Sequence, residues 1–580
     1  MGNASDNKGV WGLDRFCGPI ILNTQYYLAG RVFVDLSGRV ETVGTGTPKH
    51  MTINLARFPC LTHAWIGYAR LVDTCLGGVK TDGGFVRARA AEWGWSTLLV
   101  LTFSAYYIVP SLPASIVLLM LCFAICYIRL ALAVSLVPLA MPFFMLPKHL
   151  GHPHPQFALG ETAIVLCILA FFAHLLYDIL RGQAAKVSAM VRQLAPSSLL
   201  GYVVPLFLFA ATVATVAAHS RHEALEGYRW TIVEPIIYYS LVVCLLREVR
   251  SMVRALWALA GSGIIVASLG IGQYLFTPRL LTGATWVKGV RVPLHQPSSV
   301  YGSPDNLALL LDRALPVAVV LGLAAFTANP TRKPRMYAAW LGVAIMVIAD
   351  VLSGSRGGMI TAAAAIVFVV LLWRGHPFDR ANRPLLLGGA IAVVIGTIAV
   401  LIQVQHGLST SMRPLVWGSA LRMIRDHPFL GVGPDNFLAY YFDPHIAIDP
   451  AHPKTTNCLP ANVHLAARYY MSPLAANEPC LSHPHTVILD VWLSTGFLGF
   501  VAFVALILAL SRAALVAVRH YRNGGMRVVS IASIIIVVAT VVHGLVDNSL
   551  FVPDLAVAFW LALALFTNAN TTTSRPIPRI

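Results

Sequence analysis

Charged residues are scarce in this sequence. Asp, Glu, Lys and Arg make up 12% of its 580 residues, whereas a soluble protein carries about 25%. Hydrophobic residues account for 57%, and the mean hydropathy is +0.70. These values exclude a soluble globular protein and an intrinsically disordered chain. An outer-membrane β-barrel is also excluded, because barrel strands alternate over short runs and the apolar residues here form long blocks.

Cysteine is sparse as well. The nine cysteines are too few and too scattered for a zinc or iron–sulfur framework, or for a secreted disulfide scaffold. Met1–Asp6 lacks a basic region followed by an apolar one, so we expect no signal peptide. The two halves share no matching pair of Gly- or Pro-broken spans, which argues against a transporter built from repeats.

Long apolar blocks are abundant instead. A helix needs about 20 mainly apolar residues to cross a bilayer, and the blocks predict an all-α polytopic membrane protein with 12–14 transmembrane helices. The fourteen candidate segments are 95–110, 112–128, 130–146, 158–178, 199–219, 232–247, 255–276, 305–327, 337–352, 358–373, 385–404, 487–511, 529–547 and 551–568.

The formal net charge of +17 is explained by topology and needs no nucleic acid. Lys and Arg collect in the cytoplasmic loops of membrane proteins. With fourteen alternating spans, the basic loops at 328–336, 374–384 and 512–528 fall on one side. We therefore expect both termini to be cytoplasmic and the loops 277–304 and 405–486 to be extracytoplasmic.

This topology divides the chain into five parts. The first is a cytoplasmic N-terminal extension without a span, to which we assign no role. The last is a short cytoplasmic tail. The five parts are the extension 1–92, a transmembrane region 93–404, a large extracytoplasmic loop 405–486, C-terminal transmembrane helices 487–568 and the tail 569–580.

The loop 405–486 is the longest connection between spans, and such loops are usually functional or disordered. Arg413-Pro414 begins a predicted helix, because Pro suits a first turn, and His427-Pro428 ends it. Apolar residues recur on one face of this helix, so we predict an amphipathic helix lying along the outer membrane surface. The residues of this apolar stripe are Val416, Ala420, Met423 and Ile424.

Four motifs follow one another along the chain. Each is placed at the end of a span or in the large loop. They are Tyr301-Gly-Ser-Pro-Asp-Asn306, Ser353-Gly-Ser-Arg-Gly-Gly358, Arg413 with Trp417 and the Gly-x-Gly turn 431–433, and His483-Pro-His485 followed by Thr495-Gly-Phe-Leu-Gly499. In this order they resemble the O-antigen ligase family, which includes Wzy-type polymerases, over about residues 110–568. The chain departs from the family pattern at Thr486, where Asn is frequent, and in its N-terminal extension.

The resemblance implies a GT-C-like glycosyltransferase on the periplasmic side of a bacterial inner membrane. Its donor would be a glycan on undecaprenyl diphosphate and its acceptor a hydroxyl of the lipid A core, with inversion and without metal or cofactor. Membrane lipids are further partners. We favour a ligase because one large outer loop with an Arg–His pair fits that branch.

Three alternatives stay open. A Wzy-type polymerase and a protein O-oligosaccharyltransferase differ from the ligase in their acceptor. A transporter of lipid-linked sugars would belong to another class, and it would place charges near the membrane midplane, whereas most Arg residues here stand at span ends.

Transfer from a diphosphate needs cations that hold the leaving group, and the planar fork of Arg matches phosphate oxygens. Arg356 is the first candidate, because Gly354, Gly357 and Gly358 could let a phosphate approach the backbone. Arg413 is the second candidate. A contact with lipid headgroups for Arg356 and a solvated helix face for Arg413 are the alternatives. Further candidates in the loop 277–304 are Arg279, Lys288 and Arg291.

A base can take the proton from the attacking hydroxyl. The resemblance assigns this role to His485, since an imidazole titrates near neutrality. His483 is the rival and could position substrate, as could Asn306. Asp547 resembles an acidic family position and could orient the histidine or the acceptor, although packing against an Arg would also account for it.

Five histidines of the large loop follow its glycine turn 431–433, which could suggest a metal. We expect no metal site, because no pair has the i, i+4 spacing of a zincin helix. Besides His483 and His485 they are His445, His452 and His464. Cys458 and Cys480 are the cysteines of this loop, and a disulfide between them would pin it.

Overall fold

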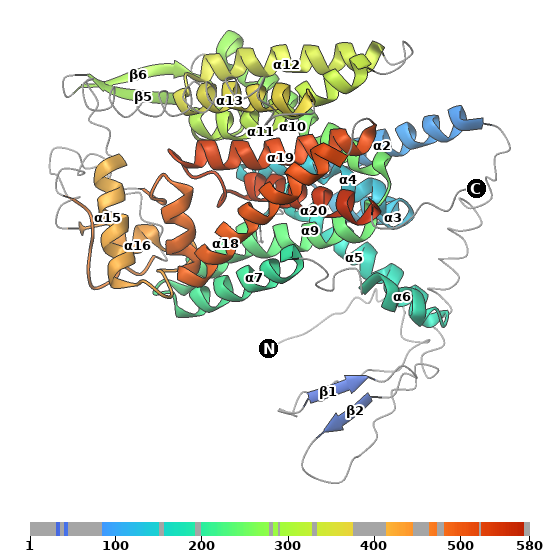
Figure 1. Cartoon of the computed structure of the whole chain (residues 1–580), viewed down its shortest axis with the longest axis horizontal. Helices are drawn as coiled ribbons and strands as arrows, with labels where there is room; N and C mark the ends of the chain where they lie inside the picture. Colours follow the sequence, from blue (N-terminus) through green and yellow to red (C-terminus); the bar gives the residue numbers. More distant parts are fainter. Residues whose placement is uncertain are drawn as a thin grey trace, which may run out of the picture. The chain divides into compact units, whose positions relative to one another are not determined.

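The computed structural model describes residues 31–34, 40–43, 84–149, 156–191, 199–277, 282–287, 290–327, 333–374, 413–444, 463–472, 481–520 and 524–573. Within these ranges the regular structure is helical apart from three antiparallel hairpins (Figure 1). The hairpins are β1 (Arg31–Val34) with β2 (Val40–Val43), β3 (Lys148–His149) with β4 (Gln156–Phe157), and β5 (Thr282–Val287) with β6 (Val290–Gln296).

The helices follow in chain order. The first group is α2 (Gly84–Ile108), α3 (Leu112–Ile128), α4 (Leu130–Ala140), the 3-10 helix η2 (Met141–Met145), α5 (Leu159–Leu180), α6 (Ala184–Val191), α7 (Leu199–Ala217), α8 (Arg221–Tyr228), the π-helix η3 (Arg229–Val233), α9 (Glu234–Leu245) and α10 (Val249–Phe276). The second group is α11 (Pro304–Thr327), α12 (Lys333–Ser353), α13 (Arg356–Trp373), α15 (Arg413–Asp426), α16 (Phe437–Tyr441), α18 (Val487–His520), α19 (Gly525–Gly544) and α20 (Pro553–Thr573).

These helices agree with the predicted spans. A helix stands at thirteen of the fourteen candidate segments, and the remaining segment, 385–404, lies outside the described residues. Eight of the described helices are long and apolar enough to cross a membrane, and three shorter apolar helices accompany them. The chain is therefore an all-α multi-pass membrane protein.

The chain divides into two units, Met1–Thr81 and Asp82–Ile580. In the first unit, β1 pairs with β2 so that Arg31 lies opposite Val43. The second unit contains all of the described helices, beginning with α2 at Gly84. The candidate site therefore lies in the second unit.

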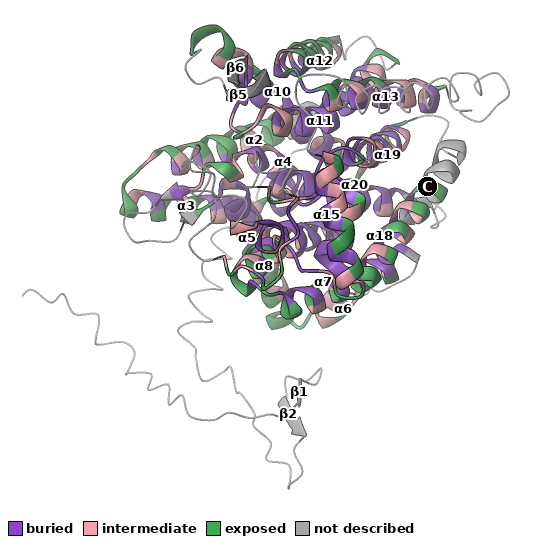
Figure 2. Ribbon diagram, turned by 90° about the vertical axis from the view of Figure 1, so that its left-hand side faces the viewer, coloured by how far each residue is buried: buried purple, intermediate pink, exposed green. Residues whose placement is uncertain are grey.

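Helix α11 forms the centre of the helical unit. Its apolar stretch is 89% buried, against 33% for those of α5 and α12, and Figure 2 shows the same contrast between inner and outer helices. It packs against α10, α12, α13 and α19. Because lipid is as apolar as Leu, helices in a membrane associate through close packing and interhelical hydrogen bonds. Polar groups in the buried stretch of α11, Leu307–Gly322, are therefore surrounded by protein.

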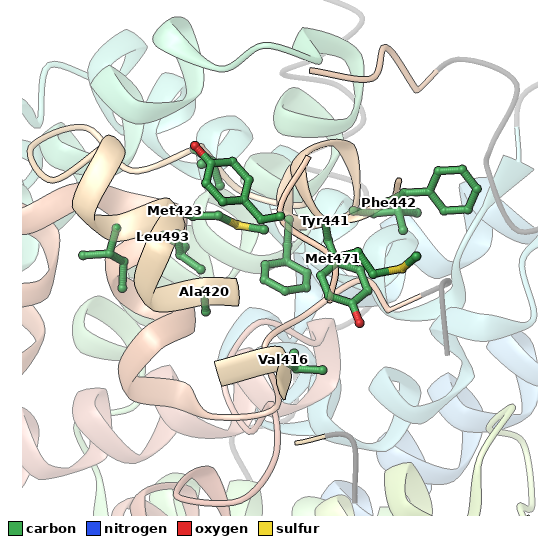
Figure 3. Packing of buried hydrophobic residues seen from close by; sticks show 12 residues of the cluster. Val416, Ala420, Met423, Tyr441, Phe442, Met471 and Leu493 are labelled. Carbon is green, nitrogen blue, oxygen red and sulfur yellow. The ribbon is translucent and has the colours of Figure 1, made fainter. Parts of the chain in front are cut away.

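Helix α15 begins at Arg413 and ends at Asp426, as the sequence predicted. Its apolar stripe does not lie against a membrane, so that part of the prediction is wrong. Figure 3 shows Val416, Ala420 and Met423 turned toward Tyr441 and Leu493. The stripe joins a core formed with α16 and α18, and burial there removes the same apolar surface from water that a bilayer would.

The glycine turn 431–433 packs against a break in α18. Gly496 interrupts the helix with φ of 71°, a conformation that side chains resist. The N–H groups of Val432 and Gly433 both donate to the Leu493 carbonyl, at 2.7 and 3.0 Å. The Phe497 N–H donates to the Phe429 carbonyl at 3.1 Å. Two glycine motifs far apart in sequence thus lock the large loop onto α18.

Candidate functional site

Three of the predicted site residues meet around one carboxylate. Asp547 Oδ1 lies 2.8 Å from His485 Nδ1, and Asp547 Oδ2 lies 3.8 Å from Arg413 Nη2. They come from the start of α15, the turn before α18 and the turn after α19. The side chains of His485 and Arg413 are about a third exposed, whereas that of Asp547 is 11% exposed. Asp547 is therefore the buried link between two accessible groups.

The electrostatics of this cluster favour an ionised Asp547. Burial alone would raise the pKa of Asp547, but the charge of His485, its hydrogen bond and the charge of Arg413 outweigh burial and hold the pKa of Asp547 below the ordinary value. An ionised carboxylate only accepts hydrogen bonds, so His485 Nδ1–H is the donor. The lone pair of a neutral His485 ring then resides on Nε2.

His485 also has an unusual backbone. Its φ is +52°, a left-handed conformation that few residues other than glycine adopt. Such strain persists only where the surroundings enforce it, and it is concentrated at functional sites. Pro484 precedes His485 and is buried, while Thr486 and Val487 behind it are also buried. The ring is thus held by rigid neighbours on both sides.

Arg356 is the first residue of α13, directly after the N-cap Ser355. The next residue, Gly357, packs on α19, because a Cβ there would lie 2.9 Å from His543 Nε2. Asp547 follows His543 by one helical turn, and its N–H donates to the His543 carbonyl at 3.0 Å. Arg356 therefore lies at the same end of the helices as the Arg413–Asp547–His485 cluster, and its side chain is exposed.

The glycines beside Arg356 let neighbouring protein groups approach closely, and their predicted contact with a phosphate stays a prediction. A Cβ at Gly354 would lie 2.2 Å from Gln296 Nε2, and one at Gly358 would lie 2.7 Å from the Ala308 Cβ. Together with the contact of Gly357, these close approaches let α13 begin against neighbouring protein groups. The glycines thus fix where Arg356 stands.

His483 has a different environment from that of His485. Its Nδ1 lies 3.2 Å from Asp490 Oδ2 and its Nε2 lies 3.8 Å from Asp435 Oδ1. Burial alone would lower the pKa of His483, but the charges of Asp490 and Asp435 outweigh burial and raise it to about 9. Both ring nitrogens therefore face carboxylates, and a protonated His483 joins the start of α18 to the glycine turn.

The other predicted residues are not brought into the cluster by the described contacts. Asn306 lies in the first turn of α11 and is half-buried. His464 contributes its backbone N–H to Ser220 Oγ at 3.2 Å. Arg291 lies in β6, but its side chain is not described. Arg279, Lys288, His445, His452, Cys458 and Cys480 lie outside the described residues.

No set of three or more His, Cys, Asp or Glu side chains in the described ranges could hold a metal ion. The described cysteines Cys122, Cys126, Cys167 and Cys244 are free and buried.

Sequence reasoning missed a second layer of charge beneath the cluster. Asp312 and Arg313 on α11 are both 0% exposed. Asp312 is hydrogen-bonded to His543, and Arg313 Nη2 donates to the Ser549 carbonyl at 2.6 Å. Two adjacent charged residues inside the segment 305–327 were the available signal, since ionisable residues within a span are rare and usually functional.

The fold and the site define a class: a multi-pass helical membrane protein with an Arg–Asp–His cluster at the end of its spans. The family model of O-antigen ligase matches residues 341–504. This match supports the assignment to the O-antigen ligase family that the motifs predicted. The matched stretch contains Arg356, Arg413 and His485 and ends before Asp547.

The family consists of glycosyltransferase-like ligases and polymerases, and the match supports an enzyme of that kind. A search of curated proteins found no match to this chain.

Proposed function

We propose that the protein is an O-antigen ligase that moves a glycan from undecaprenyl diphosphate to a hydroxyl of the lipid A core. The observation that carries the proposal is the link of Arg413 and His485 through Asp547. A cation for the leaving diphosphate and a base for the attacking hydroxyl are the two groups that this transfer needs.

In this proposal Arg413 and Arg356 bind the diphosphate. Both are arginines that begin a helix, and both have side chains that solvent reaches. A guanidinium stays charged at all relevant pH values and binds phosphate oxygens in a fork. The two charges stabilise the diphosphate as negative charge builds on it during departure. Arg279 and Arg291 are proposed as further donor ligands, and Asn306 and His483 as residues that position substrate.

His485 acts as the base, and Asp547 orients it. The acceptor oxygen attacks the anomeric carbon of the donor sugar, and its proton passes to His485 Nε2. The bond between the anomeric carbon and the phosphate oxygen breaks, and undecaprenyl diphosphate leaves with the electron pair. Asp547 fixes the Nδ1–H tautomer, so that the lone pair of Nε2 faces the acceptor. Attack from the side opposite the leaving group inverts the anomeric carbon.

We further propose a location in the bacterial inner membrane with both termini cytoplasmic and the site on the periplasmic side. The support is the positive-inside rule, because the basic loops 328–336, 374–384 and 512–528 then share the cytoplasm. A disulfide between Cys458 and Cys480 fits the oxidising periplasm.

The release of undecaprenyl diphosphate tests the proposed enzyme. Purified protein in liposomes receives a lipid-linked glycan, with or without a lipid A-core acceptor. We expect undecaprenyl diphosphate to appear only with the acceptor, together with glycan on the acceptor. A transporter of lipid-linked sugars would move the donor between leaflets and leave it intact, and that result would contradict the proposal.

The acceptor is tested in a deletion strain. A polysaccharide gel of its lipopolysaccharide separates ligation from polymerisation. Complete loss of attached polymer identifies a ligase, as proposed. Single unpolymerised repeats on lipid A would identify a polymerase and overturn the choice of acceptor.

A further inference from the structure

We propose that the buried pair Asp312 and Arg313 of α11 positions Asp547, and through it His485, from inside the membrane region. This inference rests on the proposed function, since it assigns a role in the same transfer. It concerns positioning residues, which act through Asp547 and do not touch the substrate.

The pair is costly, and stability alone does not account for it. Both side chains are fully buried in α11, the most enclosed of the eight described helices that are long enough to span a membrane. Moving a charged group out of water is unfavourable, and pairing with an opposite charge only partly offsets this penalty. Asp312 Oδ1 and Arg313 Nε find no hydrogen-bond partner among the described residues. Two apolar residues would avoid this loss of hydration free energy. We therefore infer that the charges have a role other than stabilising the fold.

The contacts of the pair bracket Asp547 along the chain. Asp312 bonds to the ring of His543, one turn before Asp547, and Arg313 Nη2 donates to the carbonyl of Ser549, two residues after it. The two bonds come from adjacent residues on one helix. They therefore hold both sides of the short turn that carries the carboxylate.

The turn also has hydrogen bonds of its own. The Asp547 N–H donates to the His543 carbonyl at 3.0 Å, and the Asn548 N–H donates to Asp547 Oδ1 at 2.8 Å. Ser549 Oγ donates to the Thr540 carbonyl at 2.6 Å. A shift of Ser549 would therefore move the backbone that aims the Asp547 carboxylate at His485.

The charge of Arg313 also matters. Arg313 Nη1 donates to the Leu309 carbonyl on the same helix, and Nη2 donates to the Ser549 carbonyl. Asp312 and Asp554 contribute negative charge around the guanidinium, and the Asp554 carboxylate accepts a hydrogen bond from Tyr301 at 2.6 Å. Two nitrogens of Arg313 are thus fixed by hydrogen bonds. A neutral side chain would lose this anchoring, and the turn would gain freedom.

A double-mutant cycle tests the inference. Transfer is measured for wild type, Arg313→Gln, Asp547→Asn and the double variant. If Arg313 acts through Asp547, Arg313→Gln lowers turnover about tenfold in the wild type and less than about twofold once Asp547 is Asn. Equal losses in both backgrounds would overturn the inference. If Arg313→Gln does not fold, the same double-mutant cycle is measured with Asp312→Asn in its place.

A binding measurement separates positioning from general damage. We expect Arg313→Gln to bind undecaprenyl diphosphate within about threefold of wild type, because Arg356 and Arg413 are unchanged. A fall in binding as large as the fall in turnover would contradict a positioning role.

Asn568→Ala is the matched control. Asn568 is also buried and bridges helices, donating to the Val242 and Leu246 carbonyls at 3.0 Å. It lies fourteen residues beyond Asp554 on α20, or about 21 Å along the helix. The effect of Asn568→Ala on turnover should be the same with Asp547 and with Asn at position 547.

Absence of transfer by the wild-type protein would refute the proposed function itself and not the positioning role of Arg313.

Discussion

His485 Nδ1 and Asp547 Oδ1 lie 2.8 Å apart, although they belong to different turns of the chain. The bond fixes one ring nitrogen as a donor and leaves the other for a proton. Asp547→Asn keeps the shape and removes the charge, so that the tautomer is no longer fixed. We expect transfer to fall by about 10²-fold, within the range of general acid–base effects.

Initial rates in liposomes measure this loss. Glu92→Gln serves as the control, because it breaks an exposed ion pair with Arg254 at 2.8 Å and such pairs contribute little. A rate for Asp547→Asn equal to that of Glu92→Gln would mean that the carboxylate has no part in the transfer.

Gly496 supports the site through its backbone. A Cβ at this position would lie 2.2 Å from the Phe429 carbonyl oxygen, and its φ of 71° belongs to glycine. Gly496→Ala should therefore destabilise the protein by about 1–3 kcal/mol, measured as a lower melting temperature in detergent. Gly272→Ala is the control, because Gly272 has no atom within 4 Å of an added Cβ. Equal melting temperatures for the two variants would refute the tight contact.

His483 makes stability depend on pH. The pKa of His483 in the folded protein is about 9, above the ordinary histidine value of 6.5. The stability that the protonated ring contributes is therefore fully present below about pH 6.5 and is lost as the pH rises through about 9. The facing Asp435 has its pKa raised by burial to about 6, so it completes its ionisation in the lower part of that window, in the wild type and in a His483 variant alike.

Thermal unfolding from pH 6.5 to pH 9.5 tests this dependence. The wild type should lose more stability over this range than His483→Gln, which cannot gain the proton. Parallel curves for the two proteins would show that the carboxylates do not hold a proton on His483.

Hydropathy was sufficient to predict most of the fold. Apolar blocks of span length predicted the helices, and Pro414 with His427-Pro428 predicted the bounds of α15, because local propensity and chain breakers act over a few residues. The apolar stripe of α15 was assigned to a membrane, since periodicity identifies a buried face and does not identify what covers it.

The site was predictable only as separate residues. The order of the motifs identified Arg356, Arg413, His485 and Asp547 as candidate site residues. No local sequence pattern, however, determines which turns of the chain lie close together in the fold. The Asp547 link therefore required the fold. Asp312 and Arg313 were visible as charges within a predicted span, and their bonds to His543 and Ser549 depend on how α11 packs on α19.

The proposed transfer is tested most directly by comparing the transfer rates of three variants. Two of them change arginines of α15, and the third changes His485. Glycan transfer to a lipid A-core acceptor is measured in liposomes for Arg413→Ala, Arg425→Ala and His485→Ala. Arg425 is the control, because its side chain is 72% exposed and pairs with its neighbour Asp426. We predict that Arg413→Ala and His485→Ala lower transfer by about 10²-fold or more and that Arg425→Ala stays near wild type. Transfer at the wild-type rate by all three variants would contradict the assignment of Arg413 and His485 to the site.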